Sequence, residues 1–91
     1  MKWDQILTLQ DQARESGYEP ADPFEWLPFI EANAMSANFN MAQNLSKTAL
    51  KDDVRIRVAI CKVWKRVQAQ GSERSADQLQ ISQALVTFQC P

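Results

Sequence analysis

The segment from Val54 to Gln70 constrains the fold more than any other part of the chain. Its first residues, Val54-Arg-Ile-Arg-Val-Ala-Ile60, alternate between apolar and polar side chains as a β-strand would. At about 100° per residue, however, one arc collects Ile56, Ile60, Val63, Trp64 and Val67, and the opposite arc collects Arg55, Lys62 and Arg66. Because the helical period accounts for the whole segment and the alternation only for its beginning, we predict a helix over about residues 53–70.

The ends of this segment carry side chains that suit helix termini. Asp52 or Asp53 can cap the N-terminus, and Lys65 and Arg66 lie near the C-terminus, where the helix dipole favours cations. Gly71 follows as a stop. Termini and periodicity therefore support the same helix.

The N-terminal part of the chain predicts two further helical stretches. A helix is predicted over about residues 3–16, because helical spacing places on one face Trp3, Ile6, Leu7, Gln10 and Ala13. Gly17 follows at the position of a left-handed cap. Asp22 and Pro23 suit a cap and a first helical position, so a helical turn should begin near residue 23. Pro28 then requires either a kink or a fresh helix running to about Met35, because proline removes a backbone hydrogen bond.

The remaining segments are also helical or turn-like. The Asn and Ser residues between Asn33 and Asn40 favour caps and turns, and a helix from about Met41 to Leu50 follows. A last helix begins at Ser75, with Ile81, Ala84, Leu85 and Phe88 on its apolar face. Since the chain has no repeat and no Gly/Ser linker, we predict an all-α fold, a compact bundle of four to five short helices forming one domain over residues 1–91.

Composition supports a single folded unit. Of the 91 residues, 45% are hydrophobic and 23% are charged, which is typical of globular domains and unlike disordered chains. No apolar run is long enough to span a bilayer or resembles a signal peptide, so we predict a cytoplasmic protein that does not associate with membranes. Cys61 and Cys90 show no framework spacing and are interpreted as reduced thiols, with a pairing through Cys90 as the alternative.

Several kinds of chemistry are excluded by the residues that the chain lacks. It contains no histidine, which removes the usual general base and the commonest metal ligand. Its two glycines, Gly17 and Gly71, both lie at predicted helix ends, so neither a P-loop nor a dinucleotide-binding turn can form. We therefore predict a protein that is not an enzyme, with no catalytic residue, no cofactor and no metal.

Charge is distributed unevenly along the chain. Residues 1–50 contain three basic and seven acidic side chains, and residues 51–91 contain seven basic and four acidic ones, which makes about −4 and +3. Asp4, Asp11 and Glu15 share their spacing with Arg55, Lys62 and Arg66. Two stripes of opposite sign could therefore face each other within one molecule or between partners, although solvated helix faces are the more common explanation of such stripes.

The basic stripe also permits a second interpretation. Together with Lys65, the residues Arg55, Lys62 and Arg66 could lie along nucleic-acid phosphates, as in helix-turn-helix proteins. The preceding segment lacks the usual turn glycine, and the balanced net charge of −1 is unfavourable for phosphate contacts.

Large aromatic and apolar side chains provide a third set of candidates. Tyr18, Phe24, Trp26 and Phe29 lie in a proline-rich segment that would hold the rings on a stiff backbone, as binding hot spots require, although at least two of these rings should belong to the core. Leu79, Val86, Val54, Val58 and Cys61 lie off the main apolar faces, which suits a homodimer face, a groove for a partner helix, or helices packed on two sides.

These observations favour a small regulator, adaptor or inhibitor of the kind found among accessory bacterial or phage proteins, which acts by binding another protein through a helical surface. The alternative is a nucleic-acid-binding regulator that uses the basic face of the helix at about residues 53–70. A structural subunit without a regulatory role is the third interpretation. Neither the partner nor the oligomeric state follows from the residues.

Overall fold

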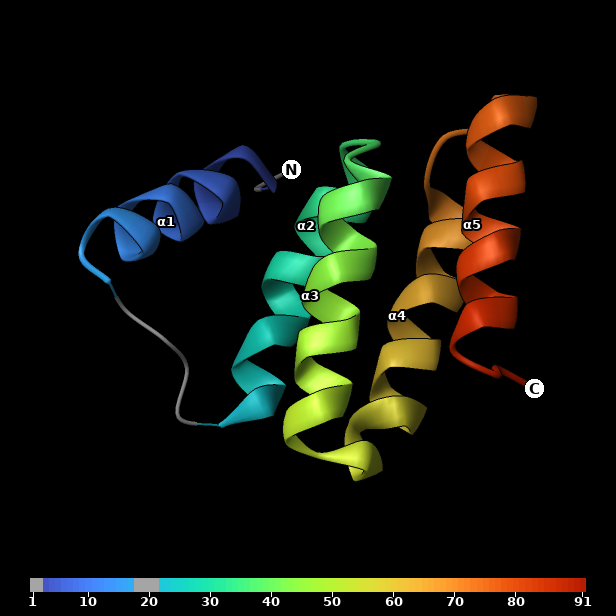
Figure 1. Cartoon of the computed structure of the whole chain (residues 1–91). Coiled ribbons are helices and arrows are strands. Elements are labelled where there is room, and N and C mark those ends of the chain that lie inside the picture. The colour runs from blue at the N-terminus through green and yellow to red at the C-terminus, as the bar shows by residue number, and fades with distance from the viewer. Residues whose placement is uncertain (1–2, 18–21) are drawn as a thin grey trace.

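The computed structural model describes residues 3–17 and 22–91, and within them every regular element is helical (Figure 1). The α-helices are α1 (Trp3–Glu15), α2 (Leu27–Met35), α3 (Phe39–Asp52), α4 (Arg57–Gln70) and α5 (Ser75–Thr87). Two short 3₁₀ helices, η1 (Pro23–Trp26) and η2 (Val54–Ile56), lead into α2 and α4. The predicted all-α bundle is confirmed, and none of the helices in the described part of the chain has the length and apolar character that crossing a bilayer requires.

Helix α2 lies at the centre because it is apolar on most of its surface. Ile30, Ala32 and Ala34 are buried, and Leu27, Phe29 and Met35 are half-buried. Helices α3 and α4 pack on one side of α2, α5 packs on α4, and α1 packs against α2 from the other side (Figure 1).

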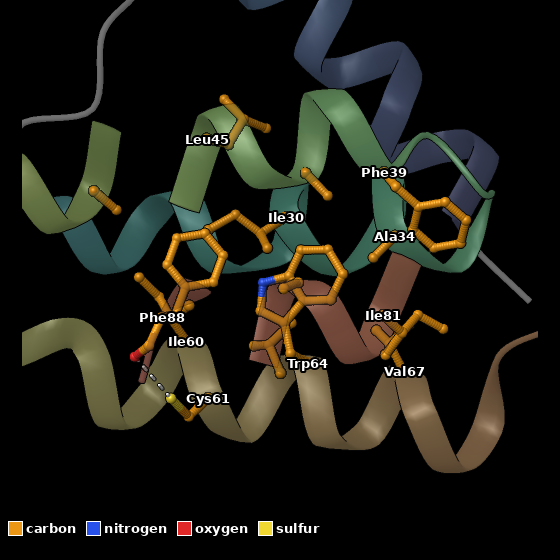
Figure 2. Close-up of a cluster of buried hydrophobic side chains, with 14 of the residues drawn as sticks. Ile30, Ala34, Phe39, Leu45, Ile60, Cys61, Trp64, Val67, Ile81 and Phe88 are labelled. Carbon is orange, nitrogen blue, oxygen red and sulfur yellow. Dashed lines mark hydrogen bonds between the residues drawn. The ribbon is translucent and has the colours of Figure 1, made fainter. Parts of the chain in front are cut away.

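The core forms around Trp64 (Figure 2). Its indole Nε1 donates a hydrogen bond to Ser46 Oγ at 3.2 Å, and its ring stacks on Phe88 with centroids 6.3 Å apart. The predicted apolar arc is confirmed completely, since every member is buried: Ile56, Ile60, Val63, Trp64 and Val67.

The helix predicted at about residues 53–70 begins and ends where predicted, but its first turn, η2, is a 3₁₀ helix. Its last turn contains no basic residue, because Lys65 and Arg66 lie further from the end. Asp53 accepts a hydrogen bond from the backbone N–H of Arg55 at 2.9 Å. Gly17 has the expected left-handed conformation with φ 74°. Gly71 does not; a Cβ there would lie 2.6 Å from the carbonyl oxygen of Val67, so close approach of the backbone explains this glycine.

The connection between α2 and α3 is shorter than predicted. Helix α3 begins at Phe39, before the expected Met41, and the turn is confined to residues 36–38, with Ala37 at φ 64°. Asn33 stays inside α2 because its side-chain amide finds partners there, so it does not compete with the helical backbone. At Pro28 the structure shows a short turn followed by a fresh helix, which begins at Leu27.

Candidate functional site

Helix α4 presents its basic face to solvent because its apolar arc is anchored in the core. Lys62 and Lys65 are exposed on this face, and no ion pair to either is found among the described residues. The structure brings them together around one hollow with Arg57, which was not a candidate, and with Val58, which was predicted to lie off the main apolar faces.

The other two basic candidates are already paired with carboxylates. Arg55 forms a two-fold contact with Asp53, and its side-chain hydrogen bonds hold the pKa of Asp53 below its usual range. Arg66 binds both oxygens of Glu31 on α2, at 3.0 and 3.1 Å, and these hydrogen bonds raise the pKa of its guanidinium group. Arg55 and Arg66 therefore serve the fold, and less of their charge is available to a partner.

The hollow beside Lys62 and Lys65 has a volume of about 400 Å³. The end of α4 supplies Arg57, Val58 and Cys61, and the C-terminal turn supplies Gln89 and Pro91. Arg57 donates a hydrogen bond to Gln89 Oε1 at 2.9 Å, which joins the two walls.

A second hollow, of about 330 Å³, shares Arg57 and Gln89 with the first. Leu50, Val54 and Thr87 also line it. Val54 and Val58 are 75% and 65% exposed. We call this region the basic-apolar surface and define it as Val54, Arg57, Val58, Lys62, Lys65 and Gln89.

The C-terminal wall is held by a disulfide bond between Cys61 and Cys90, whose Cα atoms are 5.5 Å apart. The expectation of two reduced thiols is therefore wrong. The two cysteines are 29 residues apart, so no local spacing indicated that they pair. They meet because α5 runs antiparallel to α4 and brings the chain back beside Cys61 (Figure 1). The cytoplasmic location, which was predicted from the lack of a long apolar run, stays a prediction.

The acidic candidates lie far from this surface in the fold. Asp4, Asp11 and Glu15 are exposed on α1, which packs chiefly against α2. Among the described residues they form no ion pair with the basic stripe. Pairing of the stripes within one molecule is therefore not observed, and pairing between molecules stays a prediction.

The aromatic candidates are divided between core and surface. Phe24 is exposed, whereas Trp26 and Phe29 are half-buried and pack against the core, and Tyr18 lies outside the described residues. The indole Nε1 of Trp26 is buried and has no hydrogen-bond partner within residues 3–17 and 22–91. Trp26 and Phe29 are thus positioned more as supports of the core than as a projecting contact surface.

Sequence reasoning missed Arg57 and Gln89 at the basic-apolar surface, and it did not connect the buried amides Gln10 and Asn33. Gln10 was assigned to the inner face of its helix, and that position at helical spacing was the available signal that a polar side chain would be buried. Its partner Asn33 was interpreted as a turn residue.

Comparison with protein-family models, curated proteins and solved structures gave no match. The described part of the chain contains no group of three or more Cys, Asp or Glu side chains that could hold a metal ion. A functional assignment must therefore come from the surfaces themselves.

Proposed function

We propose that this protein acts by binding another protein, without catalysis, through the basic-apolar surface. The observation that carries the proposal is the grouping of Arg57, Lys62 and Lys65, which have no carboxylate partner among the described residues, around exposed Val54 and Val58. A surface that is both cationic and apolar suits an acidic segment with apolar side chains.

The nature of the surface favours protein over nucleic acid as the partner. Phosphate binding depends on the number of cations in contact, and Arg55 and Arg66 are already engaged with Asp53 and Glu31. Exposed valines contribute nothing to phosphate contacts but contribute to a protein interface. A regulator, adaptor or inhibitor would use such a surface, and so would a homodimer.

Charge reversal at the surface tests the proposal. Lys62→Glu/Lys65→Glu should abolish the capture of a stoichiometric protein partner from nuclease-treated extract. The matched control is Lys47→Glu/Arg74→Glu, which makes the same change in net charge at exposed positions outside the surface and should capture the partner normally.

The alternatives give different results. If the protein captured only nucleic acid, and this binding weakened steeply as the salt concentration was raised, the surface would be a nucleic-acid-binding site instead. Equal loss of the protein partner in both double variants would show that net charge, and not this surface, determines binding.

A further inference from the structure

A third hollow, larger than the two at the basic-apolar surface, lies between α1 and the α2–α3 turn. Its volume is about 630 Å³, within the range of small-ligand sites. Amide side chains dominate its lining, namely Gln10, Asn33, Asn38, Asn40, Asn44 and Gln80. No part of the basic-apolar surface contributes to it.

Two of these amides are buried and held in fixed orientation. Gln10 is 6% exposed and Asn33 is 3% exposed. Asn33 Nδ2 donates to the backbone carbonyl of Phe29 at 2.7 Å and to Gln10 Oε1 at 2.8 Å. Because a carbonyl can only accept, Phe29 determines which end of the Asn33 amide carries nitrogen, and Asn33 in turn determines the orientation of Gln10.

This arrangement leaves one unused group on each amide. Asn33 Oδ1 and Gln10 Nε2 take part in no hydrogen bond among the described residues. Neither is a buried atom without a partner, so each keeps some contact with solvent, and both residues line the hollow. The hollow is thus lined by two joined and preoriented amides, of which one offers an acceptor and the other a donor.

The N–H and C=O of one residue in an extended peptide are complementary to such a pair. Both groups project to the same side of the strand, and paired strands exchange two hydrogen bonds in this way. The peptide N–H would donate to Asn33 Oδ1, and the peptide C=O would accept from Gln10 Nε2.

Charge selects among peptides. Among the described residues that line the hollow, Asp11 is the charged one, and Asp4 and Glu15 are exposed on the same helix. The described lining residues include no cation that could bind a phosphate or a carboxylate. We propose that the hollow binds a short extended segment of a basic peptide, whose main chain contacts Gln10 and Asn33 and whose Lys or Arg side chain contacts Asp11. This site is separate from the basic-apolar surface, so either can fail alone.

An NMR titration of the oxidised full chain tests the site. The probes are acetyl-Lys-Ala-Lys-amide, the same peptide with N-methylated alanine, and acetyl-Glu-Ala-Glu-amide. The first should shift the side-chain NH₂ signals of Gln10 and Asn33. N-methylation should weaken binding about fivefold through loss of one hydrogen bond, and the acidic peptide should not bind.

Two variants at exposed positions of α1 separate this site from general attraction to an acidic surface. Asp11→Asn should weaken binding of the basic peptide about threefold, whereas Glu15→Gln, which removes the same charge outside the hollow, should change it less. The proposal would be overturned if the basic peptide caused no shifts at Gln10 and Asn33. It would also be overturned if the acidic or the N-methylated peptide bound as tightly as acetyl-Lys-Ala-Lys-amide, or if both variants weakened binding equally.

Discussion

The outer helices α1 and α5 each contain 13 residues, yet they are attached to the molecule in different ways. Helix α5 buries Ile81 and Ala84, and the chain that follows it is joined to α4 through Cys90. Among the described residues of α1, the one buried side chain is the polar Gln10, which accepts a hydrogen bond of 2.8 Å from Asn33.

This difference separates the two candidate sites. The basic-apolar surface rests on apolar packing and a covalent bond, whereas one wall of the amide-lined hollow is α1, whose described apolar side chains are at most half-buried and whose buried contact is the Gln10–Asn33 hydrogen bond. Segments with few buried apolar contacts open at lower free energy than the core. We expect α1 to open locally while the other helices stay folded.

The largest expected effect is the loss of a buried isoleucine from α5. Ile81→Ala should lower the free energy of unfolding by about 4 kcal/mol, because Ile81 is fully buried and leaves a cavity. Ile6→Ala on α1 should lower the same free energy by only about 1 kcal/mol, because the side chain of Ile6 is half-buried. Urea denaturation followed by circular dichroism measures both, and equal losses would remove the contrast between the two helices.

Reduction of the disulfide should have the next largest effect. Opening the Cys61–Cys90 bond across 29 residues should cost about 3 kcal/mol, because the unfolded chain gains conformational freedom. The measurement compares the urea midpoint with and without reductant. In the Cys90→Ser variant the reductant should change nothing, and an unchanged midpoint in the wild type would contradict the proposed support of the C-terminal wall.

Disruption of the amide pair should affect mainly α1. Gln10→Ala should cost about 2 kcal/mol, because Asn33 Nδ2 loses a buried partner. Hydrogen exchange should accelerate for the amides of α1 and not for those of α4. The control is Gln12→Ala, an exposed position on the same helix; if both variants gave the same exchange rates, the pair would not be what holds α1.

The smallest effect concerns the start of α4 and depends on pH. Hydrogen bonds from Arg55 lower the pKa of Asp53 in the folded state, so their stabilisation is complete above the ordinary Asp pKa of about 4 and is lost as the pH falls through the lower folded pKa. Asp53→Asn should therefore lower the thermal midpoint slightly at pH 7 and less at about pH 3.

The neighbouring variant Asp52→Asn controls for the change in net charge, since Asp52 is exposed and caps no helix. If Asp52→Asn reproduced the pH dependence of Asp53→Asn, the effect would come from net charge and not from the contact with Arg55.

The sequence predicted the helices better than the sites. Val54–Ile60 was correctly assigned to a helix because the period of the apolar side chains extends beyond the short alternation. Of the charged candidates, Lys62 and Lys65 lie together at a hollow, whereas Arg55 and Arg66 are paired with carboxylates. All four residues are exposed on the polar side of the predicted helix, so the sequence gives no sign of which of them have a carboxylate nearby in the fold.

Local patterns along the chain were sufficient for the all-α class, the central apolar arc of α4 and the stops at both glycines, because helix periodicity and capping act over a few residues. Three features depended on the tertiary structure: the Cys61–Cys90 bond, the Arg66–Glu31 pair and the Gln10–Asn33 pair, which join positions 29, 35 and 23 residues apart. Such partners are chosen by the packing of helices against one another, and helical spacing carries no information about which face meets which.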